Sequence, residues 1–174
     1  DTDTSGVYSC SLSGDDSADF SASTTGKVCT VVFAANPNYE SPADANTDNV
    51  YQLTITFTDG TNTQAHNTAI TVTDVNDQTP TYSITTATPS IAEGTSTVET
   101  VSITDTDTGD NNACTLGGAD AADFTCTVSA TQYVLAFAAT PNYESPVDAD
   151  TDNEYVVTVT ISDGTNTGAT VTYS

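Results

Sequence analysis

The sequence repeats itself at a constant spacing of 104 residues, and the alignment of the two copies needs no gap. Comparison of residues 1–70 with residues 105–174 gives 35 identical positions out of 70. A repeat of this regularity indicates one structural unit used in series, and the 174 residues hold less than two periods of it. Many of the identical positions are Asp, Asn, Glu and turn-forming residues, as in the Asn-Tyr-Glu-Ser-Pro segments at 38–42 and 142–146. Because these residues carry oxygen atoms, the repeat points to bound cations.

Apolar residues alternate with polar residues in short segments of both copies. Residues 51–57 place Tyr, Leu, Ile and Phe at every second position, and residues 155–161 place Tyr, Val, Val and Ile in the same way. A period of two is typical of a β-strand with one buried face. We find no convincing amphipathic helix, and turn-forming residues separate the segments. We therefore expect an all-β chain with one antiparallel sandwich for each repeat.

The boundary between the repeats is expected in the acidic segment 74–80, which follows a strand and ends in proline. Proline cannot donate a hydrogen bond to a sheet and so ends the strand. Repeat 1 is then residues 1–80, and repeat 2 is residues 81–174. Residues 81–104 have no counterpart in repeat 1, so we expect repeat 1 to lack its first strands and repeat 2 to have a truncated last strand. Either the chain is part of a longer tandem array, or a neighbouring subunit supplies the missing strands by strand addition.

The chain carries a formal net charge of −23, with Lys27 as its only Lys or Arg and His66 as its only histidine. Such a surface repels nucleic acid and anionic membrane, so neither is expected as a partner. Multivalent cation binding and solvation in a salty medium both explain the acidity, and both can hold together. No run of 18 apolar residues is present, so we expect no membrane insertion in this segment. Because no nucleophile elbow, phosphate-binding loop or metal-hydrolase motif is found, we expect no enzymatic activity.

The four cysteines fall in two pairs, Cys10 with Cys29 in the first repeat and Cys114 with Cys126 in the second. Four cysteines allow three connectivities, of which pairing within each repeat is the natural one. Disulfides form in oxidising compartments, so the cysteines predict an extracellular or cell-surface location. A cysteine metal site is the alternative, but no C-x-x-C motif or neighbouring histidine supports it.

Several acidic motifs together resemble the cadherin repeat. They are Asp74-Val75-Asn76-Asp77 followed by Pro80, Asp105-Thr106-Asp107, Asn142-Tyr143-Glu144 and Asp163-Gly164, with Glu93 near the first strand of the second repeat. The resemblance covers essentially the whole chain and is closest to the cadherin-like repeats of bacterial and archaeal surface proteins. It implies tandem Ig-like, cadherin-like Greek-key β-sandwiches that bind Ca²⁺.

In the cadherin family, two consecutive domains and the linker between them share the calcium ligands, and up to three ions bind there. Ca²⁺ takes six to eight oxygen ligands at about 2.3–2.6 Å, which carboxylates and carbonyls supply. For the junction inside this chain, the resemblance assigns Glu40 and Asn38 from repeat 1; Asp74, Asn76 and Asp77 from the linker; and Asp105, Asp107, the Asn111 carbonyl and Asp163 from repeat 2.

Two departures from the family pattern weaken this assignment. The family usually has Asp where Asn38 and Asn142 stand, so each of these positions lacks a charge. The Glu that would serve the internal junction belongs before Asp1, so we expect a weaker site unless a neighbour supplies that residue.

By the same resemblance, each end of the chain carries half of a further site. The downstream half consists of Asp1, Asp3 and Asp59, and the upstream half consists of Glu93, Asn142 and Glu144. Complementary halves imply head-to-tail contacts with copies of this chain or with adjacent repeats. A heterologous contact that does not close into a ring gives an open filament.

A second acidic segment, Asp-Ala-Asp-Thr-Asp at 148–152, places oxygen-bearing side chains at every second position. Residues 44–48 repeat this segment with Asn46 in place of the central Asp. The pattern resembles the start of an EF-hand loop, but the closing Gly and the distant Glu are missing. The segment is therefore either an additional ion site or a solvated turn whose side chains cap the backbone.

Together these features predict an extracellular calcium-binding structural or adhesive protein, in which calcium at the domain junctions makes a cell-surface filament or stalk rigid. One alternative is a spacer module of a large adhesin. Another is an accessory module of a secreted polysaccharide-degrading enzyme.

Overall fold

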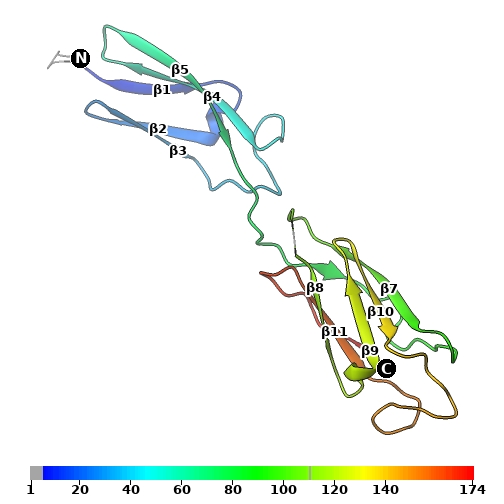
Figure 1. The fold of residues 1–174 in the computed structure, drawn as a ribbon. Helices are drawn as coiled ribbons and strands as arrows, with labels where there is room; N and C mark the ends of the chain where they lie inside the picture. Colours follow the sequence, from blue (N-terminus) through cyan, green and yellow to red (C-terminus); the bar gives the residue numbers. More distant parts are fainter. Residues whose placement is uncertain (1–5, 110) are drawn as a thin grey trace. The chain divides into compact units, whose positions relative to one another are not determined.

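The computed structural model describes residues 6–109 and 111–174, so Asp1 and Asp3 lie outside the described residues. The chain forms two compact units, which we name unit 1 (Asp1–Val75) and unit 2 (Asn76–Ser174). Both units consist of antiparallel β-strands (Figure 1). No helix in the described ranges has the length and hydrophobicity that a membrane span requires. The prediction of an all-β chain is confirmed.

The boundary between the units falls after Val75, whereas the repeat pattern predicts it after Pro80. Residues 76–80 pack with unit 2, where Pro80 is fully buried. Gly168 makes room for this segment, because a Cβ at that position would lie 2.6 Å from the carbonyl oxygen of Pro80. The equivalent position in unit 1 is Gln64, whose side chain is exposed. The acidic linker is therefore largely a part of unit 2 and not a separate tether.

Unit 1 contains two antiparallel sheets. β1 (Ser9–Ser13), β4 (Val50–Thr58) and β5 (Thr63–Thr71) form one sheet in the order β1-β4-β5. β2 (Phe20–Thr25) and β3 (Val28–Phe33) form the other sheet as a hairpin. A short 3-10 turn, η1 (Ser17–Asp19), precedes β2.

Unit 2 contains the same arrangement with additional strands. β12 (Val171–Tyr173), β11 (Val157–Ser162) and β8 (Ala113–Gly117) form one sheet in that order. β6 (Thr81–Tyr82), β7 (Thr97–Thr104), β10 (Gln132–Phe137) and β9 (Phe124–Val128) form the second sheet in that order, with a 3-10 turn, η2 (Ala121–Asp123), before β9. The chain crosses between sheets from β7 to β8, returns from β8 to β9, and crosses again from β10 to β11, as in the Greek-key connections of a sandwich.

The elements of the two units correspond at the spacing of 104 residues. β1 and β8 have identical bounds after this shift, as do β3 and β10, and η1 and η2. The described part of unit 1 has no counterpart of β6 and β7. As a result β3 pairs only with β2, whereas β10 pairs with both β7 and β9.

Unit 2 has the larger hydrophobic core. Its buried side chains occupy every second position of the strands, as the sequence pattern predicts: Val101, Ile103, Phe124, Tyr133, Leu135, Val157, Val159, Ile161 and Tyr173. In unit 1 the buried apolar residues are Phe20, Tyr51 and Leu53. The difference follows from the missing strands, because β7 alone contributes two buried side chains to unit 2.

Both disulfides form within a unit, so the predicted pairing is confirmed. Cys10 of β1 joins Cys29 of β3 with a Cα–Cα distance of 5.7 Å, and Cys114 of β8 joins Cys126 of β9 at 6.1 Å. Each bridge therefore connects the two sheets of its own sandwich. Closing loops of this length stabilises a fold by about 3 kcal/mol in the chain-entropy model.

Candidate metal sites

The linker binds to unit 2 at the ends of two strands. The backbone N–H of Gln78 donates to Asp107 Oδ2 at 2.7 Å, just beyond the end of β7. The side-chain amide of Asn166 donates to Asn76 Oδ1 at 2.9 Å, in the turn that follows β11. Residues 76 and 78 can be at most about 7 Å apart, because an extended chain spans about 3.3–3.6 Å per residue. The linker therefore brings the ends of β7 and β11 to one place.

Asp105 and Asp107 form the first acidic part of this site. The backbone N–H of Asp107 donates to Asp105 Oδ1 at 3.2 Å, and Asp107 is only 7% exposed. Among the described residues, Asp105 Oδ2 and Asp107 Oδ1 are buried and accept no hydrogen bond. A buried carboxylate oxygen that accepts no hydrogen bond is costly, so such oxygens are typical of a site that binds a cation or water. Carboxylate oxygens are the ligands that Ca²⁺ prefers, and this donor set fits it.

Asp163 forms the second acidic part and also holds its own turn. Its Oδ1 accepts the N–H groups of Thr165 at 2.7 Å and Asn166 at 2.6 Å, and the residue is 2% exposed. Burial acts to raise the pKa of the carboxyl, but the hydrogen bonds from Asn166 and Thr165 together hold this pKa below its ordinary value. The N–H of Asn111 donates to the carbonyl of Asp163 at 3.2 Å, so the predicted Asn111 ligand lies beside it. The charged form of Asp163 is therefore stabilised before any cation binds.

Asp77 and Asn76 occupy the linker as predicted. Asp77 is exposed, and its Oδ1 accepts the side-chain amide of Gln78 at 2.6 Å. Unit 2 thus brings together the second-repeat residues and two of the three linker residues assigned to the junction: Asn76, Asp77, Asp105, Asp107, Asn111 and Asp163.

Unit 1 carries the remaining residues assigned to the internal junction. A carboxylate oxygen of Glu40 and one of Asp74 lie within 4.8 Å of each other. Asn38 is exposed, and its Oδ1 accepts the N–H groups of Glu40 at 2.9 Å and Ser41 at 3.2 Å. Asn38 therefore has a structural role in its own turn, and its role as a calcium ligand stays a prediction.

Asp59 in unit 1 repeats the turn geometry of Asp163. Its Oδ1 accepts the N–H groups of Asn62 at 2.6 Å and Thr61 at 2.8 Å. These bonds, led by that from the Asn62 backbone, lower the pKa of Asp59 to about 2. The carboxylate is therefore ionised at neutral pH, as a cation ligand must be. Its predicted partners Asp1 and Asp3 lie outside the described residues.

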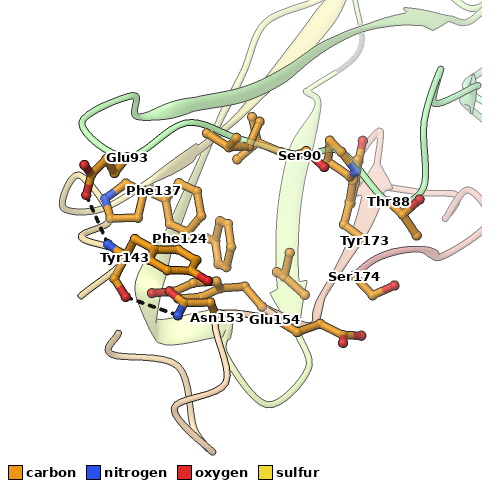
Figure 2. A pocket seen from close by; sticks show the side chains of 16 residues that line it. Thr88, Ser90, Glu93, Phe124, Phe137, Tyr143, Asn153, Glu154, Tyr173 and Ser174 are labelled. Atoms are coloured by element: carbon orange, nitrogen blue, oxygen red, sulfur yellow. Dashed lines mark hydrogen bonds between the residues drawn. The ribbon is translucent and has the colours of Figure 1, made fainter. Parts of the chain in front are cut away.

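Glu93, Asn142 and Glu144 are exposed in unit 2. Glu93 lines the cavity in Figure 2 together with Tyr143, the residue between Asn142 and Glu144. The N–H of Tyr143 donates to Glu93 Oε2 at 3.3 Å, and Asn142 Oδ1 accepts the N–H of Glu144 at 3.1 Å. The cavity has a volume of about 570 Å³, and core side chains such as Phe124 line it. The predicted upstream half-site is thus brought together at the rim of an opening into the core.

Sequence reasoning missed a pair of buried aspartates, one in each unit. Asp120 Oδ1 accepts the N–H of Ala149 at 2.7 Å, and its Oδ2 accepts the N–H of Val156 at 2.6 Å. Asp16 holds the equivalent loop of unit 1 through two bonds of the same lengths. Their recurrence at a spacing of 104 residues was the available signal.

Asn166 recurs in the same way, as the counterpart of Asn62, but no role was predicted for it. Its side-chain amide donates both to Asn76 and to Asp163 Oδ2, the latter at 3.3 Å. Asn166 is therefore the residue that connects the linker to the acidic turn after β11.

Comparison with solved structures identifies the fold. A structure of protocadherin gammaB7 EC3-6 matches 98% of this chain with a TM-score of 0.68 at 22% sequence identity. Human protocadherin-24 EC1-2 matches 95% with a TM-score of 0.63 at 16% identity, and Drosophila N-cadherin EC1-4 matches 95% with a TM-score of 0.63 at 23% identity.

The share of each known structure that is covered differs. The matched regions make up 40% of the protocadherin gammaB7 and N-cadherin chains and 79% of the protocadherin-24 chain, so this chain spans about two fifths of the length of the first two. No protein-family model and no curated protein sequence matches this chain. The likeness in structure, the two-sheet topology and the Greek-key crossings agree, and the chain has the cadherin-like β-sandwich fold.

Proposed function

We propose that this chain is a pair of tandem cadherin-like repeats from an extracellular, non-enzymatic protein with a structural or adhesive role. In this proposal, calcium bound at the junction between the repeats makes the junction rigid. The cadherin-like fold and the two disulfides support an extracellular adhesion module. The acidic motifs support a surface protein of the bacterial or archaeal type that they resemble.

The observation that carries the calcium proposal is the pair of buried, unpartnered carboxylate oxygens on Asp105 and Asp107. Unit 2 contains no Lys, Arg or His, because the only Lys and the only His are Lys27 and His66. No basic side chain of unit 2 can therefore neutralise these carboxylates. A divalent cation is the simplest partner that satisfies several carboxylates together.

The chain's own residues would hold the cation from both units. Unit 2 and the linker would contribute oxygens of Asn76, Asp77, Asp105, Asp107, the Asn111 carbonyl and Asp163. Unit 1 would contribute oxygens of Glu40, Asp74 and Asn38. Bound Ca²⁺ would neutralise these carboxylates and supply a strong electrostatic link between them. The hydrogen bonds of Gln78 and Asn166 already fix the linker on unit 2, so less conformational entropy would be lost on binding.

Head-to-tail association follows from the half-sites that remain at the two ends. Glu93, Asn142 and Glu144 would meet a downstream half such as Asp1, Asp3 and Asp59 of a further repeat or a second copy. The edge of β3 supports this reading, because β3 pairs with one strand where β10 pairs with two. A strand equivalent to β7 would complete unit 1 by strand addition, whether from the same polypeptide or from another copy. Nucleic acid and anionic membrane are poor partners for a net charge of −23.

Calcium titration by isothermal calorimetry tests the junction. Asp107→Asn keeps an acceptor for the N–H of Gln78 but removes one carboxylate charge, and we expect calcium to bind this variant at least tenfold more weakly. Asp15→Asn is the matched control, because Asp15 is exposed in unit 1 and the same charge is removed. Equal affinities for both variants and the unaltered chain would refute the junction site.

Negative-stain electron microscopy distinguishes the roles. Uniform filaments in millimolar calcium that fall apart after chelation would support a calcium-dependent polymer. Isolated particles would favour the alternatives, in which these repeats are a spacer of an adhesin or an accessory module of a secreted polysaccharide-degrading enzyme.

A further inference from the structure

The acidic turn at 148–152 in unit 2 differs from its counterpart at 44–48 in unit 1 at one position, where Asp150 replaces Asn46. Both turns begin with a buried aspartate, Asp148 or Asp44, each 3% exposed. In unit 1 the side-chain amide of Asn46, at the centre of the turn, donates to Oδ2 of Asp48, at the end of the turn, at 2.9 Å. In unit 2 the equivalent residue is Asp150, whose ionised carboxylate cannot donate a hydrogen bond.

Three carboxylates consequently converge in unit 2. One carboxylate oxygen from each of Asp148, Asp150 and Asp152 lies within 4.8 Å of the others. Two oxygens bound to the same Ca²⁺ are at most about 5 Å apart, since each Ca–O distance is about 2.3–2.6 Å. The three oxygens are thus close enough to contact one ion. Unit 2 offers no basic side chain that could neutralise them.

The buried aspartate gives a second and independent observation. Asp148 Oδ2 accepts the N–H of Asp152 at 2.8 Å, but its Oδ1 is buried and accepts no hydrogen bond in the described part of the chain. In unit 1 both oxygens of Asp44 are satisfied, by the N–H groups of Asp48 at 2.8 Å and Asn49 at 3.3 Å. The turn that gains a carboxylate is therefore also the turn in which one oxygen of the buried aspartate accepts no hydrogen bond.

We infer that the turn at Asp148–Asp152 is a second cation site, which binds a divalent, oxygen-preferring ion such as Ca²⁺ within unit 2 alone. Asp148, Asp150 and Asp152 are its ligands, and water completes the coordination because Asp150 and Asp152 are exposed. The site does not depend on the proposed junction, since all three ligands belong to one turn of one unit. We expect an affinity of about 10⁻⁴–10⁻³ M, the range of extracellular modules with few ligands. The equivalent turn of unit 1 binds no such ion because Asn46 closes it.

Residue-resolved NMR of the complete chain during a calcium chloride titration tests this inference. We expect the backbone amides of residues 148–153 to shift with a saturable curve, and the amides of 44–49 to remain unchanged. Asp150→Asn copies the turn of unit 1, so it is expected to fold normally and to weaken binding at 148–153 at least tenfold. Asn46→Asp is the reciprocal variant, and we expect it to create calcium-dependent shifts at 44–49.

The NMR titration reports calcium binding at this turn and at the junction through different amides. Saturable shifts at Gln78 and Asp107 report the junction, and their presence or absence does not alter the reading at 148–153. Unchanged binding in Asp150→Asn, or no saturable shift at 148–153 up to about 10 mM calcium, would overturn the inference. A lack of new shifts in Asn46→Asp would overturn the role assigned to residue 150.

Discussion

We predict that the carboxylate of Asp120 makes a large contribution to the stability of unit 2. It fixes the long loop between β10 and β11 by accepting the N–H groups of Ala149 at 2.7 Å and Val156 at 2.6 Å, and the residue is 3% exposed. Asp120→Ala leaves both donors without this partner. Hydrogen bonds to charged groups contribute about 1.5–3 kcal/mol each. The two bonds together therefore contribute about 3–6 kcal/mol. Because the substitution also removes the cost of burying a charge, we expect the free energy of unfolding to fall by about 3 kcal/mol, the lower end of that range.

Differential scanning calorimetry measures this loss. A loss of 1 kcal/mol lowers the melting temperature of a 60–100-residue domain by about 4–8 °C, so we expect a decrease of at least about 12 °C in the unit 2 transition. Glu154→Ala is the control, because it removes the same charge from an exposed side chain of the same loop. Asp16→Ala should lower the unit 1 transition instead, since Asp16 accepts two equivalent bonds there. If Asp120→Ala and Glu154→Ala melt at the same temperature, the reasoning is wrong.

Two further predictions concern unit 2. Gly168→Ala would place a Cβ 2.6 Å from the carbonyl oxygen of Pro80. We therefore expect the free energy of unfolding to fall by about 1–3 kcal/mol and the amides of the linker to exchange hydrogen faster. Unchanged exchange would contradict the packing of Pro80 against Gly168. Burial, with hydrogen bonds to Tyr133 and Glu99, raises the pKa of Tyr173 above the ordinary 10.0. The resulting stabilisation is present in full below about pH 10 and is lost as the pH rises above it, where the unfolded chain loses the proton first. We therefore expect the free energy of unfolding, measured with denaturant, to fall less between about pH 8 and 11.5 in Tyr173→Phe than in the unaltered chain. The exposed control Tyr143→Phe should lose as much stability over this pH range as the unaltered chain.

The strands and disulfides of this chain were predictable because their signals are local and periodic. Alternation at 51–57 and 155–161 follows from the pleat of a strand with one buried face, and both segments contribute to core strands. β11 begins at Val157, and the N–H of the preceding residue, Val156, donates to Asp120. Such a contact joins residues far apart in sequence and leaves no trace in local periodicity.

The acidic site was predictable only in part. Asp105 and Asp163 follow directly on β7 and β11, Asp107 lies two residues after Asp105, and the motifs of all three predict metal ligands. The burial of Asp120 was not predicted, since a single aspartate in a chain of net charge −23 is typical of a solvated surface residue, and only its recurrence as the counterpart of Asp16 indicated a structural role. The turn role of Asn38 was likewise hidden, because an amide oxygen at that position suits a cation or a backbone N–H equally well.

The central claim is that calcium makes the junction between the two units rigid. ¹⁵N relaxation of the complete chain tests it most directly, because it reports the rotational motion of each unit separately. In millimolar calcium we predict one common correlation time for both units, and in chelator two shorter times, one for each unit. Asp107→Asn in calcium should behave as the unaltered chain does in chelator. Identical correlation times with and without calcium would contradict the account.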